Sequence, residues 1–257
     1  DRLLTEQGIH LYRQDFNIDP LPFWRANDAE DRQGITEIRH VEGYLAYWDE
    51  LIKRHPGMLI DSCASGGRRN DLETLRRAVP LLRSDYIMEP IGNQCHTYAL
   101  SPWFPFYGTG TSKTDPYLVR STLCPHFTAC WDHREDSLDW ATLRRLVDQW
   151  KAFAPNFFGD YYPLTPYTLK DSDWIAWQFD RPEEGKGMVQ AFRRPNSIYV
   201  TAQLPLSALD PNARYAVTDV DAPDTRVEFS GSELLGAGFP MTMTGKPSSV
   251  VYVYEKL

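Results

Sequence analysis

A change of hydrophobic pattern near residues 157–167 is the feature that most constrains the fold. Before this point, short apolar segments alternate with helical segments, which predicts βαβ units around a parallel sheet. After it, short segments with alternating polarity follow one another with turn residues between them, which is typical of antiparallel β-structure. We therefore expect an α/β domain over residues 1–157 and an antiparallel β-sandwich domain over residues 158–257.

Within the first part, apolar residues at 3–4 spacing predict helices, and compact apolar runs predict strands. We expect loop structure over residues 16–32, and residues 86–116 are rich in aromatic residues, Gly and Pro. The expected helices are residues 35–55, 71–79 and 138–153. The expected strands are residues 9–15, 58–61, 81–85 and 126–132, with a further strand within 103–108.

Charge and cysteine content exclude several classes of partner. The 257-residue chain has a formal net charge of −8 and no long run of Lys or Arg, which argues against nucleic acid and anionic membranes as partners. It has no apolar stretch of membrane-spanning length. Its four cysteines lack metal-ligand spacing, so we expect buried free thiols, no metal site and no cofactor.

Two acidic residues end expected strands. Asp15 ends the first strand and Asp85 ends the segment LLRSD. In parallel α/β folds the carboxyl ends of strands carry the catalytic groups. Two carboxylates that face one cleft are the requirement for glycoside hydrolysis. By position alone, each acid is better explained as a helix cap or as the partner of an arginine.

The sequence around these acids carries more information. The segments YRQDFN (12–17), CASGGRRND (63–71) and Ser84-Asp85 resemble the corresponding segments of glycoside hydrolase family 36, the melibiase-type α-galactosidases. In that family a Lys-Trp-Asp-x-Asn segment carries the nucleophile, a Cys-x-Ser-Gly-Gly turn helps to hold galactose, and a Ser-Asp-Asn segment carries the acid/base. The family places its acid/base 22 residues after the turn cysteine, as Asp85 stands relative to Cys63.

The resemblance implies a retaining double displacement on terminal α-galactosides. Asp15 matches the nucleophile, which must be ionised, and Asp85 matches the acid/base, which must be protonated at the start. Arg13 and Asn17 match sugar-binding positions of the nucleophile segment. The remaining implied sugar-binding residues belong to the turn and are Cys63, Ser65, Gly66 and Arg69. For Arg69 an internal structural contact is an equal alternative, and Asp71 is expected to cap the next helix.

The chain departs from the family pattern at several positions. Arg13 replaces Lys, and Gln14 replaces Trp. Tyr86 replaces the Asn that follows the acid/base, and Ile87-Met88-Glu89 stands where the family continues with Thr-Asp-Ala. The differences after Asp85 leave open an α-N-acetylgalactosaminidase. A raffinose-synthase-like transglycosylase and a non-catalytic carbohydrate-binding fragment are further alternatives. His96 is expected to be structural. The alternative interpretation is that residues 94–96 and 103–108 form a modified sugar subsite.

The resemblance also implies the architecture. The family has a (β/α)8 TIM barrel, and residues 1–157 correspond to strands 4–8 only, followed by the C-terminal domain. We expect a fragment of a longer protein that is a homo-oligomer in its full-length form. The expected ligand is an α-galactoside oligosaccharide or glycoconjugate, and a cytoplasmic location is favoured over secretion.

Overall fold

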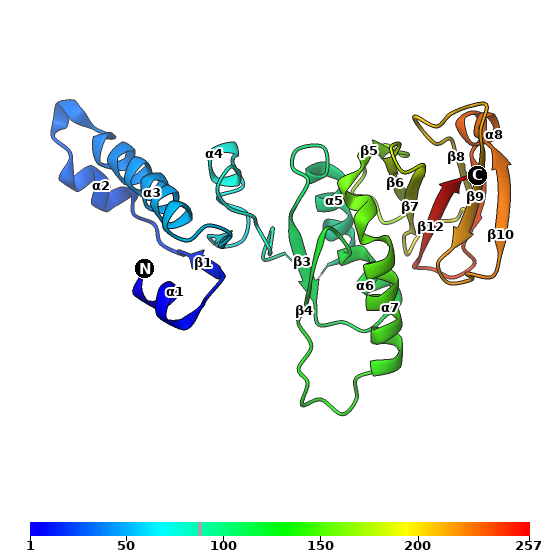
Figure 1. Ribbon diagram of the computed structural model, residues 1–257, viewed down its shortest axis with the longest axis horizontal. Helices are drawn as coiled ribbons and strands as arrows, with labels where there is room; N and C mark the ends of the chain where they lie inside the picture. Colours follow the sequence, from blue (N-terminus) through cyan, green and yellow to red (C-terminus); the bar gives the residue numbers. More distant parts are fainter. Residues whose placement is uncertain (87–88) are drawn as a thin grey trace. The chain divides into compact units, whose positions relative to one another are not determined.

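The computed structural model describes residues 1–86 and 89–257, which form two compact units, Asp1–Asp85 and Tyr86–Leu257. The first unit is the blue and cyan part of Figure 1. Its elements in chain order are α1 (Arg2–Gln7), β1 (Leu11–Asp15), α2 (Leu21–Asn27), η1 (Glu30–Arg32), α3 (Ile35–Arg54), β2 (Leu59–Cys63) and α4 (Leu72–Leu75).

The centre of the first unit is the parallel pair β1–β2. The two strands pair from Leu11↔Leu59 to Asp15↔Cys63. A small core of Trp48, Ile60 and Ala78 packs beside them, with Tyr12 and Tyr44 at its edge. Trp48 is fully buried and donates a hydrogen bond from Nε1 to Gln14 Oε1 at 2.9 Å. This contact anchors the long helix α3 to the strand that ends in Asp15.

The second unit begins with helices and one parallel strand pair. Residues 90–163 form α5 (Pro90–Leu100), β3 (Gly108–Thr111), α6 (Pro116–Thr122), β4 (His126–Ala129), α7 (Trp140–Phe153), η2 (Ala154–Phe158) and β5 (Asp160–Pro163). Strands β3 and β4 pair in parallel. The helix expected at 138–153 is confirmed, whereas α2, α5 and α6 occupy segments that were expected to be loops or were not assigned.

The remainder of the chain is antiparallel, as predicted. It contains β6 (Trp174–Arg181), β7 (Lys186–Arg193), β8 (Thr201–Leu204), β9 (Arg214–Asp219), β10 (Arg226–Ser230), α8 (Gly231–Gly236), β11 (Phe239–Thr242) and β12 (Ser248–Lys256). The main sheet has the strand order β10-β9-β12-β7-β6-β5, and β8 pairs separately with β11. The assignment of the first part to barrel strands 4–8, and the boundary at residue 157, stay predictions.

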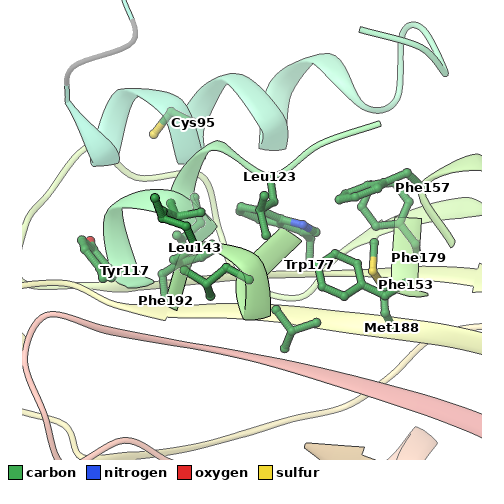
Figure 2. Packing of buried hydrophobic residues seen from close by; sticks show 14 of the residues in the cluster. Cys95, Tyr117, Leu123, Leu143, Phe153, Phe157, Trp177, Phe179, Met188 and Phe192 are labelled. Carbon is green, nitrogen blue, oxygen red and sulfur yellow. The ribbon is translucent and has the colours of Figure 1, made fainter. Parts of the chain in front are cut away.

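Both faces of the main sheet are covered. Alternate residues of β6 enter two different cores, with Ile175, Trp177 and Phe179 on one face and Trp174 and Ala176 on the other. Figure 2 shows the first core, where Trp177 lies among aromatic and aliphatic side chains contributed by helices and strands. Burial on both faces explains why β6 is so apolar in sequence.

Candidate active site

The proposed nucleophile lies at the carboxyl end of a strand, as predicted. Asp15 is the last residue of β1, and its Cα partner is Cys63, the last residue of β2. The two parallel strands therefore end together. Residues that follow them, Phe16–Asn17 and the turn after Cys63, meet at the same edge of this short sheet. The Asp15 side chain is 36% exposed, so its carboxylate is open to a ligand.

Arg13 connects Asp15 with a second acid. One guanidinium nitrogen, Nη1, donates to Oδ2 of Asp61, and the other, Nη2, lies 3.4 Å from Oδ2 of Asp15. Burial opposes the positive charge, but the hydrogen bond and charge of Asp61 outweigh it, so the pKa of Arg13 is raised. Arg13 therefore stays cationic beside the proposed nucleophile.

Cys63 is a buried part of the site. Its side chain is 1% exposed, and this burial is the main reason that the pKa of its thiol is raised. The backbone of Gly66 and the charge of Arg13 act in the opposite direction, while the hydrogen bond and charge of Asp15 raise the pKa further. The raised pKa favours the protonated thiol beside Asp15.

The turn after Cys63 has an unusual backbone that Asn17 stabilises. Ser65 has φ 47° and Gly66 has φ 77°, so two successive residues lie in the left-handed region. For Ser65 this conformation is costly. Asn17 Oδ1 offsets the cost by accepting hydrogen bonds from the Ser65 backbone N–H at 2.7 Å and from its hydroxyl at 2.9 Å. The Asn17 amide group uses its oxygen for Ser65, so its Nδ2 points away from Ser65.

Gly66 brings the turn against the segment that carries the proposed acid/base. A Cβ built on Gly66 would lie 2.6 Å from the backbone nitrogen of Asp85 and 2.9 Å from the Cα of Ser84. Only glycine allows this approach. The Asp85 side chain is exposed. The structure therefore brings Asp15, Cys63, Ser65, Gly66 and Asp85 together within one unit.

The segment before Asp85 is not the predicted strand. Residues 81–85 form bends and irregular backbone, and only Val79 makes an isolated parallel bridge, to Asp61. Side chains hold this segment instead. Asp61 Oδ1 accepts from the Leu81 N–H at 3.0 Å, and Asn70 Nδ2 donates to the Arg83 carbonyl at 3.1 Å.

Arg69 and Asp71 make structural contacts. Arg69 Nη1 donates to the Cys63 carbonyl at 3.1 Å, and its guanidinium lies over the rings of Phe16 and Tyr44 at 5.8 Å and 5.1 Å. Asp71 caps α4 by accepting from the Thr74 N–H at 2.9 Å, so its predicted capping role is confirmed. Arg69 thus supports the turn through the Cys63 carbonyl, which agrees with the internal structural contact considered as the alternative to sugar binding.

The residues that follow Asp85 belong to the second unit. Ile87 and Met88, where the chain departs from the family pattern, lie outside the described residues. Glu89 caps α5 by accepting from the Ile91 and Gly92 backbone N–H groups. The rings of Tyr86 and His96 meet edge to face, with centroids 6.3 Å apart. A subsite built from residues 94–96 and 103–108 stays a prediction.

Asp61 is a functional candidate that the sequence analysis did not identify. The run MLID was interpreted only as a buried strand, although it too ends in an acid, the feature that singled out Asp15 and Asp85. Residues 1–86 and 89–257 contain no cluster of three or more His, Cys, Asp or Glu side chains that could hold a metal ion. None of the helices in this described part is long and apolar enough to cross a membrane.

Comparison with known proteins shows which family the chain resembles. Residues 174–253 match the Glycosyl hydrolase family 36 C-terminal domain. The chain is 22% identical to α-galactosidase Mel36A of Lactobacillus acidophilus over 93% of its own length and 33% of that protein. It is 26% identical to the probable α-galactosidase C of Aspergillus terreus over 86% of its length and 30% of that protein.

A solved relative has the same fold. The whole chain superimposes on 37% of a variant of the family 36 α-galactosidase AgaA of Geobacillus stearothermophilus, in complex with raffinose, with a TM-score of 0.82 and 19% identity. The chain thus spans about a third of the length of the relatives that it matches. Residues 174–253 therefore carry the match to the C-terminal domain of glycosyl hydrolase family 36, and the chain as a whole is similar in sequence and fold to α-galactosidases.

Proposed function

We propose that this chain carries the catalytic carboxylates of a retaining glycoside hydrolase that cleaves terminal α-galactosides. Asp15 is the nucleophile and Asp85 is the general acid/base. The observation that carries the proposal is the convergence of three segments: Asp15 pairs with Cys63, and Gly66 of the following turn contacts the backbone of Asp85. The relatives support the substrate class, since they are α-galactosidases and one is bound to raffinose.

The mechanism is a double displacement. The Asp15 carboxylate attacks the anomeric carbon while the bond to the leaving oxygen breaks and Asp85 donates a proton to that oxygen. Asp85, now ionised, removes a proton from water, which attacks the same carbon and releases Asp15. This geometry requires the two carboxyl groups to lie about 5–5.5 Å apart when substrate is bound.

Other residues of the site have binding roles in this proposal. Asn17 Oδ1 is occupied by Ser65, which leaves the amide nitrogen to donate to a sugar hydroxyl. Arg13 lies beside Asp15 and can donate to a sugar hydroxyl. Of the turn residues, Cys63 and Gly66 are buried and shape the turn, whereas Ser65 is partly exposed and can be approached by a sugar ring. Arg69 acts by supporting this turn.

The architecture belongs to the same proposal. Residues 1–157 would be strands 4–8 of a TIM barrel, residues 158–257 the domain that follows it, and the full-length protein a homo-oligomer. The two parallel pairs β1–β2 and β3–β4 support a barrel origin, because parallel strands joined by helices are its building units.

The test is hydrolysis of p-nitrophenyl α-galactoside by the full-length protein, with the N-acetylgalactosaminide in parallel. Asp15→Gly and Asp85→Gly should each lower turnover by roughly 10⁴-fold. Added azide should distinguish their roles. In Asp15→Gly azide replaces the nucleophile and one displacement gives β-galactosyl azide. In Asp85→Gly two displacements give α-galactosyl azide.

Near-normal turnover in either variant would refute the assignment. Faster cleavage of the N-acetyl substrate by the unmodified protein would identify an α-N-acetylgalactosaminidase instead. No turnover of either substrate would favour a carbohydrate-binding role.

A further inference from the structure

Asp61 occupies a buried position between the two proposed catalytic segments. Its side chain is 5% exposed, and in the β1–β2 pairing its Cα partner is Arg13. The two carboxylate oxygens have different partners. Oδ2 accepts from Arg13 on the nucleophile strand, and Oδ1 accepts from the Leu81 N–H, four residues before Asp85.

On the nucleophile side, Asp61 fixes the guanidinium of Arg13. The guanidinium is planar and rigid, so a strong bond at Nη1 determines the position of Nη2. Nη2 lies 3.4 Å from Asp15 Oδ2. The orientation of the proposed nucleophile therefore depends on Asp61 through Arg13.

On the acid/base side, Asp61 holds a segment that has no strand pairing over residues 81–85. The Ser62 N–H donates to the Val79 carbonyl, and the Val79 N–H donates to the Ile60 carbonyl. After Val79, the hydrogen bond from the Leu81 N–H to Asp61 Oδ1 holds the chain closer to Asp85 against β2. A single buried carboxylate thus anchors both segments.

We infer that Asp61 is a positioning residue that sets the relative placement of Asp15 and Asp85. This inference rests on the proposed function, because it assigns Asp61 a role only if those two acids perform the chemistry. Asp61 acts through Arg13 and through the Leu81 backbone, and it needs no contact with the substrate.

The test is Asp61→Asn in the full-length protein, with p-nitrophenyl α-galactoside as substrate. Asparagine keeps an oxygen acceptor for the Leu81 N–H but removes the charge that holds Arg13. We expect kcat and kcat/KM to fall together by about 10- to 100-fold, as for a small misplacement of a catalytic group. Asp61→Glu, which keeps the charge, should recover more activity than Asp61→Asn.

A double-mutant cycle separates positioning from general damage. If Asp61 acts through Arg13, then adding Asp61→Asn to Arg13→Gln should change kcat much less than Asp61→Asn changes it in the unmodified protein. The double variant leaves no buried charge unpaired, so it keeps the test valid if Asp61→Asn alone does not fold. If the loss of kcat in the double variant equals the product of the losses in the two single variants, the inference is overturned.

Asp49→Asn is the matched control. It removes an exposed carboxylate that binds Arg77 in the same unit, at 2.6 Å and 3.0 Å, and should leave kcat unchanged. If the unmodified protein is active, Asp15→Gly is inactive, and Asp61→Asn behaves like Asp49→Asn, then only the inference about Asp61 fails. If Asp15→Gly keeps its activity, the proposed function fails and the inference about Asp61 falls with it.

Discussion

The two units of the chain differ in how they are stabilised. The second unit buries two large apolar clusters, one on each face of its main sheet. The first unit has a cluster of only three buried residues, Trp48, Ile60 and Ala78. It exposes many large apolar side chains, including Phe23 at 72%, Leu72 at 68% and Leu3 at 61%.

The residues proposed to carry the chemistry all belong to the unit with the smaller core. In place of apolar packing, hydrogen bonds between polar groups fix their positions, such as Gln14 with Trp48, Asp61 with Arg13, and Asn17 with Ser65. Such contacts are directional, so they define geometry well while contributing less free energy than a large core. The large apolar clusters therefore lie in the second unit, and the residues of the proposed site lie in the first.

The largest expected effect concerns the two units expressed separately. Residues 86–257 should fold alone and unfold cooperatively on heating, because both of their apolar clusters are internal. Residues 1–85 should show no cooperative transition and little protection from hydrogen exchange, because their core is small. Calorimetry of the two pieces measures this difference. A sharp unfolding transition in residues 1–85 would contradict the proposed difference in stability between the two units.

The next prediction perturbs the second unit alone. Trp177 is 1% exposed, lies among the aromatic side chains of Figure 2, and donates from Nε1 to Gln190 Oε1 at 2.8 Å. Trp177→Ala should destabilise this unit by about 3–5 kcal/mol through the cavity and the unpaired Gln190. Thermal unfolding followed by circular dichroism measures the loss. Turnover well below the unfolding temperature should stay near that of the unmodified protein, and a large loss of turnover there would argue that the site depends on this core.

The converse prediction perturbs the site with a smaller effect on stability. In Gly66→Ala the new Cβ meets the Asp85 backbone at a φ of +77°, which should cost about 1–3 kcal/mol. Because the collision displaces Asp85, turnover of p-nitrophenyl α-galactoside should fall by about 100-fold.

Gly43 provides the matched control and the smallest effect. It lies within α3, and a Cβ built there has no atom within 4 Å. Gly43→Ala should stabilise the first unit by about 0.5–1 kcal/mol and leave turnover unchanged. Equal losses of turnover in Gly66→Ala and Gly43→Ala would show that the contact between Gly66 and Asp85 has no special role.

The sequence predicts those helices and strands whose buried residues are apolar and regularly spaced. Helices α3 and α7 have apolar residues at 3–4 spacing, and both were predicted within one or two residues. Helix α5 was not predicted, because its buried side chains include Asn93, Gln94 and Thr97, which give no apolar stripe. Strand β3, Gly-Thr-Gly-Thr, has a weak strand signal, and its burial arises from tertiary packing.

The site was predictable to a similar extent. The end of β1 at Asp15 follows from the local pattern and is confirmed, whereas Leu81 and Leu82 suggested a strand that does not exist. Arg13 and Asp61 are 48 residues apart, as are Asn17 and Ser65. Contacts of this range depend on strand register and on the turn conformation, which no local pattern of residues specifies.

The most direct test of the central claim is to trap the glycosyl-enzyme intermediate. In a 5-fluoro-galactosyl fluoride, the fluorine at C5 slows both displacements by destabilising the positively charged transition state, but the anomeric fluoride is a good leaving group, so the covalent ester forms faster than it is hydrolysed. After digestion, mass spectrometry should find the sugar on the peptide that contains Asp15, and Asp15→Gly should abolish the label. A label on another carboxylate, or turnover without any covalent intermediate, would contradict the assignment of Asp15 as the nucleophile.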